Sequence, residues 1–305
     1  MSDSPNIYLD DPDPLSRLLN RLQLKAEVYV NGDFCGTWAV DTGGSRRIPF
    51  HLIGRGEAWL HVDQEGPNRL AEKDLVFFPR DAHHVISNSG ERPPPEAVNA
   101  PMSNDGDTTQ MVCGFFEFHN ALAYPLLDAL PETVVLRPTS SQETRRIESL
   151  VDLMLLELRE AQPGSYAVVD QLAYLLFVEI LRQQVANGKL TSGLLVALFD
   201  TRIGRALNAI HEQPELGWTL DLLAEKASMS RSSFAERFSK LAGLTPVKYL
   251  VLWRMAEARR LLSTTELSTA QIAELSGYET EAAFRKAFKK TQGQTPGEVR
   301  EAARG

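Results

Sequence analysis

The side chains best suited to chemistry in this chain lie in two basic stretches of its last third. One runs from Ser230 to Arg237 and the other from Thr280 to Lys289. An arginine can donate two hydrogen bonds to the edge of a guanine, and short hydroxyl side chains can bond to phosphate oxygens. We therefore predict nucleic-acid contacts from Ser230, Arg231, Ser232, Ser233 and Arg237 in the first stretch and from Thr280, Glu281, Arg285, Lys286 and Lys289 in the second.

The two stretches place their charges differently. The first combines Arg231 with serines, which favours base recognition. The second begins with Glu279 and Glu281 and is basic only further along, which favours anchoring on the DNA backbone. Glu281 can accept a hydrogen bond from cytosine N4, but its charge repels phosphate, so Arg285 and Lys286 are the better candidates for contact. We expect the first stretch to decide which sequence is bound.

Both stretches belong to two copies of one short repeat. Five landmarks recur 50 residues later, so that Phe234, Phe238, Gly243, Thr245 and Pro246 return as Phe284, Phe288, Gly293, Thr295 and Pro296. The pattern predicts two helix–turn–helix units joined by a helix over residues 246–263. At about 1.5 Å per residue this helix is about 27 Å long, which can hold two recognition helices about one DNA turn apart. The repeat therefore predicts a clamp on double-stranded DNA.

The net charge of −8 is unevenly distributed. Residues 201–305 carry 16 Lys and Arg against 12 Asp and Glu, a net of +4, whereas residues 1–200 carry 16 against 28, a net of −12. A basic part attached to an acidic part is typical of a DNA-binding module carried by a sensing module. The polar, acidic first residues and the lack of a long apolar run predict a cytoplasmic protein without membrane contacts.

The N-terminal half predicts a β-rich fold followed by helices. Short strands separated by glycine-rich turns are expected within residues 24–88, with a further strand at 110–118, which is typical of a β-sandwich or barrel. Helices are expected at 141–161 and 165–187. The second is apolar around most of its circumference and needs burial on two sides. We predict that a second copy of the chain covers one side, giving a homodimer; burial by the barrel and first helix alone is the alternative.

Residues from about 200 to 303 resemble the DNA-binding domain of the AraC/XylS family of bacterial transcription regulators. The most specific matching positions are Ile272-Ala-Glu, Gly277-Tyr278, Phe284, Phe288, Gly293, Thr295-Pro296 and Arg300. Residues from about 14 to 185 resemble, more loosely, the cupin-like domain that some of these regulators carry, through segments such as Phe50-His51-Leu-Ile-Gly54 and Leu75-Val-Phe-Phe-Pro79.

The resemblance implies an α+β protein. Residues 14–190 are expected to form a cupin-like β-barrel with two dimerisation helices, and residues 198–303 an all-α domain with two helix–turn–helix units. The implied function is that of a dimeric transcription regulator, an activator, whose partners are double-stranded DNA and RNA polymerase and which needs no cofactor.

An enzyme is the alternative from a different functional class. Catalytic cupins hold a metal ion with a His-x-His pair, a carboxylate and a later histidine. Here the residue two positions after His51 is Ile53, so the pair is broken and no metal site is expected. The second hypothesis, a metal-dependent cupin enzyme fused to a DNA-binding tail, is disfavoured by this broken pair.

Two features of the N-terminal half are candidates for receiving a signal. The only cysteines are Cys35 and Cys113, and an oxidant can link them if their Cα atoms lie within about 7 Å; otherwise they are two small buried side chains. A small organic effector is the other candidate signal, bound in the mouth of the barrel by Trp38, His51, Trp59 and His83.

Overall fold

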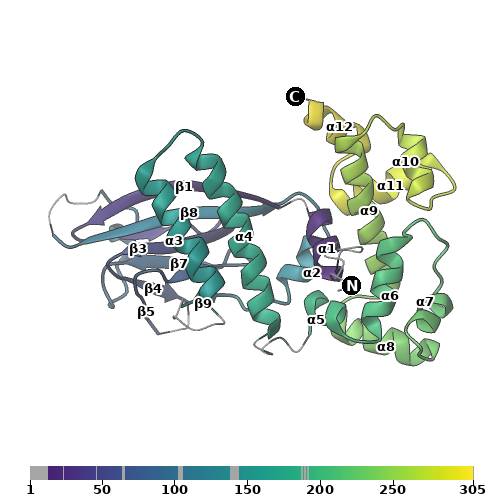
Figure 1. The fold of residues 1–305 in the computed structure, drawn as a ribbon, viewed down its shortest axis with the longest axis horizontal. Coiled ribbons are helices and arrows are strands. Elements are labelled where there is room, and N and C mark those ends of the chain that lie inside the picture. The colour runs from purple at the N-terminus through teal and green to yellow at the C-terminus, as the bar shows by residue number, and fades with distance from the viewer. Residues whose placement is uncertain are drawn as a thin grey trace, which may run out of the picture. The chain divides into compact units, whose positions relative to one another are not determined.

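The computed structural model describes residues 13–22, 24–45, 47–63, 66–101, 106–137, 144–186, 188, 190 and 192–304. These residues form two compact units, whose elements are labelled in Figure 1. The β unit contains the described parts of 24–117 and 130–190. The helical unit contains the C-terminal helices, residues 118–129 and the N-terminal helix. The predicted α+β class is confirmed.

The β unit is built from two sheets. Their strand orders are β1-β8-β3-β6-β9 and β2-β7-β4-β5, and every pair with a described register is antiparallel. A short 3-10 helix, Pro95–Ala97, also belongs to this unit. The strands are β1 Leu24–Cys35, β2 Ala39–Asp41, β3 Ile48–Arg55, β4 Ala58–Val62, β5 Asn68–Leu70, β6 Leu75–Phe77, β7 His84–Ser87, β8 Thr108–Phe118 and β9 Val134–Leu136.

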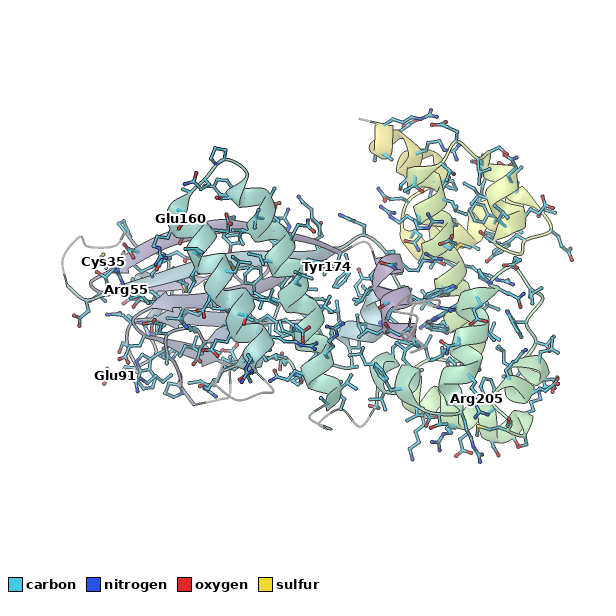
Figure 2. All side chains as sticks on the ribbon, viewed as in Figure 1. Cys35, Arg55, Glu91, Glu160, Tyr174 and Arg205 are labelled. Carbon is cyan, nitrogen blue, oxygen red and sulfur yellow. The ribbon has the colours of Figure 1, made fainter. Side chains whose placement is uncertain are left out.

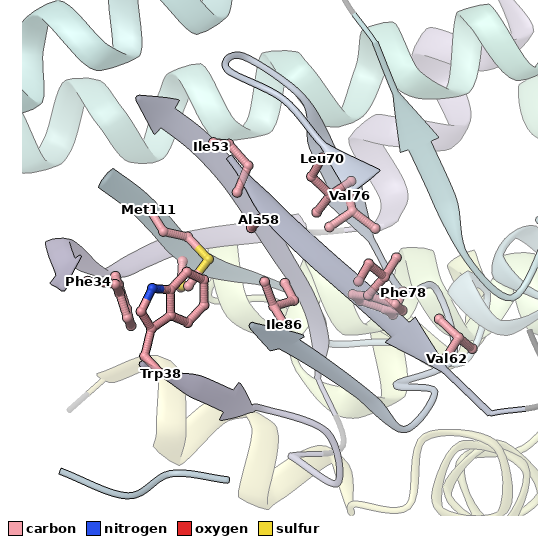
Figure 3. Packing of buried hydrophobic residues seen from close by; sticks show 12 residues of the cluster. Phe34, Trp38, Ile53, Ala58, Val62, Leu70, Val76, Phe78, Ile86 and Met111 are labelled. Atoms are coloured by element: carbon pink, nitrogen blue, oxygen red, sulfur yellow. The ribbon is translucent and has the colours of Figure 1, made fainter. Parts of the chain in front are cut away.

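Strand β3 is buried on both faces because each face meets a different layer. On one face Phe50 stacks on Phe116, which in turn contacts Phe177 of helix α4 (Ser165–Ala186). On the other face Ile53 joins the apolar cluster shown in Figure 3. A strand covered on both sides has a nearly continuous apolar sequence, which explains the run from Ile48 to Ile53.

Helix α3 (Arg145–Glu160) packs against α4, and α4 also packs on strand β1. The predicted helices at 141–161 and 165–187 correspond to these two, although 141–143 and 187 lie outside the described residues. Leu153, Val168 and Leu175 remain exposed on the helix pair. The pair therefore presents apolar side chains that the described part of the chain leaves exposed.

The helical unit contains all the remaining helices. No helix among the described residues is both long enough and apolar enough to cross a membrane. The helices are α1 Pro14–Leu22, α2 Ala123–Leu127, α5 Leu194–Phe199, α6 Ile203–Glu212, α7 Leu220–Lys226, α8 Arg231–Ala242, α9 Pro246–Thr264, α10 Thr269–Leu275, α11 Glu281–Gln292 and α12 Pro296–Arg304.

Helix α1 is not among the predicted elements, and it packs against α5, α6 and α9. Its four leucines, at positions 15, 18, 19 and 22, follow helical spacing and are all buried. Arg21 adds an ion pair of 2.6 Å with Glu257 and lies over the Trp253 ring, 5.7 Å from its centroid. Residues 14–22 and 118–129 group with the helical unit by their contacts.

Helix α9 carries the largest buried side chains of the helical unit, Trp253 and Tyr249. His211 of α6 stacks on Trp253 with ring centroids 3.6 Å apart, and its Nε2 lies 2.5 Å from the Tyr249 hydroxyl. Further along α9, Met255 and Leu262 belong to a second cluster that contains the buried residues of α10 and α11. One helix thus supplies the core of both halves of the unit.

Candidate nucleic-acid interface

Helices α8 and α11 begin in the same way. The hydroxyl of Ser230 accepts a hydrogen bond from the backbone N–H three residues later, at 3.3 Å, and the hydroxyl of Thr280 accepts the equivalent bond at 3.2 Å. Each bond satisfies an N–H that has no partner inside the helix. Each helix then ends at a glycine in the left-handed conformation, with φ of 73° and 74°. Ser230 and Thr280 therefore fix where the two helices start.

One side of each helix is packed and the other is open. Phe234 and Phe238 of α8 are fully buried, as are Phe284 and Phe288 of α11. Glu281 is half-buried. The other predicted contact residues are exposed, namely Ser230, Arg231, Ser232, Ser233, Arg237, Thr280, Arg285, Lys286 and Lys289. The phenylalanines pack both helices into the helical unit, and the polar side chains on the opposite side of each helix are exposed to a ligand.

Arg237 is engaged within the helical unit. Its Nη2 lies 2.5 Å from Oδ2 of Asp200, whose other oxygen accepts hydrogen bonds from the N–H groups of Arg202 and Ile203 at the start of α6. Burial pushes the pKa of Asp200 up, but the bonds from Arg237 and these two N–H groups outweigh it and lower the pKa overall. Arg237 therefore ties α8 to the start of α6.

Arg231 is held far more loosely. Its Nη1 lies 3.4 Å from Oδ2 of Asp221 in α7, and the two side chains are 65% and 66% exposed. An ion pair this exposed contributes little to stability, typically about 0–1 kcal/mol. The guanidinium can therefore exchange its carboxylate partner for DNA at small cost.

The second copy concentrates positive charge on its open face. Arg285 makes an ion pair of 2.5 Å with Glu281 one turn earlier in α11. A hollow of about 490 Å³ is lined by Arg285, Lys286, Lys289, Lys290, Thr295 and Pro296. Clustered cations around a concave surface attract phosphate. Lys290 was not among the predicted contact residues, although its basic neighbours in the sequence were a sufficient signal.

Three arginines of helix α9 make contacts inside the unit. Arg254 donates to the carbonyl oxygens of Pro214 and Leu216, at 2.6 and 2.7 Å. Arg259 donates to the Gln294 side chain at 2.9 Å, and Arg260 pairs with Glu257. These cations brace the joining helix against its neighbours.

The four residues predicted to form an effector pocket do not share one surface. Trp38 is 3% exposed and packs on Phe34, with ring centroids 5.1 Å apart, in the core shown in Figure 3. His51 is fully buried and Trp59 is half-buried. His83 is 54% exposed and lies 3.3 Å from a carboxylate oxygen of Asp41 and of Asp63. Of the four, His51 and Trp59 lie on strands of different sheets, β3 and β4, whereas Trp38 and His83 lie outside the strands.

His51 belongs instead to a buried chain of hydrogen bonds. Its Nε2 lies 3.1 Å from Nε2 of His84, and Oγ1 of Thr42 lies 3.0 Å from both nitrogens. Nδ1 of His84 donates to the Ala82 carbonyl at 2.7 Å, which leaves its Nε2 as an acceptor. His51 therefore donates from Nε2, and its Nδ1 accepts from the Cys113 thiol, 3.1 Å away.

Burial keeps this chain of hydrogen bonds neutral. It lowers the pKa of His51 well below the usual value, with the nearby His84 as the smaller cause. It also lowers the pKa of His84, and it raises the pKa of Cys113 to about 12. Sequence reasoning placed His51 near a ligand pocket and did not anticipate its contact with Cys113, which follows from the pairing of β3 with β8.

The two cysteines are not brought together. Cys35 is half-exposed at the end of β1, where Figure 2 labels it, and its Sγ lies 3.6 Å from Oγ1 of Thr108. Cys113 lies five residues beyond Thr108 on β8, which places it roughly 17 Å from Thr108 at about 3.4 Å per residue. A disulfide needs Cα atoms within about 7 Å. Linking them within one chain therefore requires the backbone to rearrange.

In the parts of the chain that the structure describes, no three His, Cys, Asp or Glu side chains lie close enough together to hold a metal ion. His51 and His84 supply two facing nitrogens, and their third neighbour is the hydroxyl of Thr42. A facial metal site takes two histidines and a carboxylate. The donors present do not fit the site of a metal-dependent cupin.

Known proteins match both units of this chain. Residues 13–186 match a family described as Cupin, and residues 223–302 match a helix-turn-helix domain. An uncharacterized HTH-type transcriptional regulator of Haemophilus influenzae is 30% identical, over 94% of this chain and 98% of that protein. The RCS-specific HTH-type transcriptional activator RclR of Escherichia coli is also 30% identical, over 96% of this chain and 98% of its own.

The solved DNA-binding domain of AdpA, in complex with a target DNA, is similar to part of this chain. The two are 30% identical, the match covers 34% of this chain and 93% of the AdpA chain, and the TM-score is 0.33.

Proposed function

This protein belongs to the AraC-type transcriptional regulators that carry an N-terminal cupin domain, and we propose how its two recognition helices share the work. It binds DNA sequence-specifically and is a regulator rather than an enzyme. In the proposal α8 enters one major groove and reads bases, while α11 enters the next and is held mainly by phosphates. The observation that carries the proposal is the hollow lined by four cations of α11. Helix α8 has three cations, and one of them, Arg237, is paired with Asp200.

Two substitutions test this division in a gel-shift titration. Arg231→Ala should weaken operator binding by about 1–3 kcal/mol and relax base preference if the guanidinium meets a base. Lys286→Ala should weaken binding to all sequences alike and reduce the slope of affinity against salt by about one ion. Arg205→Ala is the matched control, because Arg205 is exposed on α6, outside both recognition helices (Figure 2). If Arg231→Ala binds the operator as tightly as wild type, Arg231 is not part of the DNA interface.

We further propose that the protein acts as a homodimer and activates transcription through RNA polymerase. Leu153, Val168 and Leu175 are between 40% and 46% exposed on helices α3 and α4, and a second copy of the same pair could cover them. An activator role is supported by the similarity to RclR, which is a transcriptional activator.

Sedimentation analysis tests the dimer. Leu175→Glu should convert the protein to a monomer, because it places a charge in the apolar contact. Leu216→Glu serves as the control, since Leu216 is exposed to a similar extent, 43%, but belongs to the helical unit. A wild-type protein that is monomeric throughout the micromolar range would exclude this assembly.

We propose that the cupin unit receives the signal, which is either thiol oxidation or a small organic effector. Cys113 bonds to His51, and His51 bonds to His84, so a change at this thiol alters contacts on β3, β7 and β8 together. Chromosomal occupancy and promoter output with and without oxidant, in wild type, Cys35→Ser and Cys113→Ser, distinguish the two signals. An unchanged response in both variants favours the organic effector.

A further inference from the structure

The centre of the open face of α8 is occupied by an acidic side chain. At about 100° per residue, Phe234 and Phe238 point to one side of the helix, and Glu236, midway between them, points to the opposite side. Both phenylalanines are fully buried and Glu236 is exposed, as this geometry requires. No hydrogen bond or ion pair joins its carboxylate to another residue within the described ranges. The carboxylate is therefore available to a ligand.

The second copy has the opposite charge at the equivalent position. Lys286 lies midway between Phe284 and Phe288, 50 residues after Glu236. One turn from Glu236 are Ser232, Ser239 and Lys240, whereas Lys286 is followed by two cations, Lys289 and Lys290. The two open faces therefore favour different parts of DNA. The face of α11 has a cation at its centre and matches phosphate, whereas the face of α8 has at its centre a carboxylate, which phosphate repels.

A carboxylate that faces DNA is repelled by the phosphates, so it favours binding only where a base donates a hydrogen bond to it. Two bases present an amine in the major groove, cytosine through N4 and adenine through N6. Adenine sets its amine beside the N7 acceptor, which matches an amide side chain better than a carboxylate. A carboxylate only accepts hydrogen bonds, and cytosine N4 is the donor that it pairs with.

The neighbours of Glu236 let it reach a base. Ser232 and Ser239 are among the shortest polar side chains, so α8 can lie close to the floor of the groove beside Glu236, while the exposed Lys240 lies in the last turn of the helix and is long enough to reach a phosphate. Arg237 points away from the same line and is tied to Asp200. The longest side chain at the middle of the open face is therefore the carboxylate of Glu236.

We propose that Glu236 selects a cytosine in the major groove that α8 enters. This inference rests on the proposed function, in which α8 is the base-reading helix. Glu236 is then a specificity-determining residue, whose loss changes which sequence is bound more than how tightly DNA is bound overall.

Selection of binding sites from a random duplex library, with the full-length protein, tests the proposal. Wild type should enrich sites with cytosine at one fixed position. Glu236→Gln should replace that cytosine by adenine, because an amide can donate to N7 and accept from N6. Glu236→Ala should lose preference at that position alone, with discrimination falling by roughly 5- to 150-fold, and should bind unselected DNA more tightly. Glu301→Gln, on an exposed residue of α12, is the control and should select the wild-type sites.

Failure of the inference and failure of the proposed function give different results. If wild type enriches a defined site and both Glu236 variants enrich the same one, Glu236 has no role in recognition, while the DNA-binding function stands. If the variants lose affinity equally for all sequences, Glu236 supports the helix and reads nothing. If wild type enriches no sequence at all, base reading by α8 is itself wrong.

Discussion

The reactivity of individual side chains in the β unit depends on burial. Cys113 is 3% exposed, and burial raises the pKa of its thiol to about 12. The thiolate is the reactive form of cysteine, so a thiol that stays protonated at neutral pH reacts slowly. His51 reinforces this state, since its Nδ1 is placed to accept the S–H hydrogen. Of the two cysteines, only Cys35 is open to reagents in the folded chain.

Alkylation of the native protein tests this difference. We expect iodoacetamide at neutral pH to label Cys35 and to leave Cys113 unmodified, as measured by mass spectrometry of the peptides. In urea both should be labelled, which controls for intrinsic peptide reactivity. Equal labelling of the two cysteines in the native protein would mean that β8 opens far more easily than its buried pattern indicates.

Helix α1 shows how an element from the start of the sequence can stabilise helices from its end. Leu18 is fully buried, and it belongs to a helix that contacts α5, α6 and α9. Replacing a buried leucine by alanine removes contacts and leaves a cavity, which costs about 2–5 kcal/mol. Leu18→Ala should therefore raise amide hydrogen exchange in α6 and α9 and leave the β-strands unchanged.

Asn20→Ala is the matched control for this experiment, because Asn20 lies on the exposed side of the same helix. It should leave exchange near the wild-type level throughout. Faster exchange in the strands, with α6 and α9 unaffected, would instead assign α1 to the β unit.

The elements differ in how far the sequence predicts them. The repeat could be predicted closely, because its caps, glycines and phenylalanines are local signals that recur in order. Helix α1 could also have been predicted, because its leucines follow helical spacing. Helix α2, Ala123–Leu127, was not, since five residues are too few for a periodic pattern.

The site residues also divide into those set by local spacing and those set by tertiary packing. Exposure of the recognition residues could be predicted from their spacing to the buried phenylalanines, and Glu236 could have been found by that rule. The bond between Arg237 and Asp200, the contact of Cys113 with His51 and the separation of Cys113 from Cys35 depend on tertiary packing and strand register. No local pattern fixes which residues of distant segments meet.

At the scale of the whole molecule, both units bury neutral histidines. Burial lowers the pKa of His51 and of His84 in the β unit. In the helical unit burial, followed by the charges of Arg17 and Arg21, lowers the pKa of His211 to about 3. In an unfolded chain histidine titrates near about 6.5. Below that pH the unfolded state binds protons that the folded state does not, so the free energy of unfolding decreases.

We therefore expect each unit to be most stable above about pH 7 and to lose up to about 1.4 kcal/mol per pH unit for each buried histidine below about pH 6.5. Urea unfolding at fixed salt between pH 7.5 and 5, followed by hydrogen exchange in each unit, measures the loss. Most carboxylates titrate near pH 4, below this range, so the histidines dominate the slope. His119→Gln, on an exposed histidine, should keep the wild-type slope. A flat profile over this range would show that the buried imidazoles accept protons without unfolding.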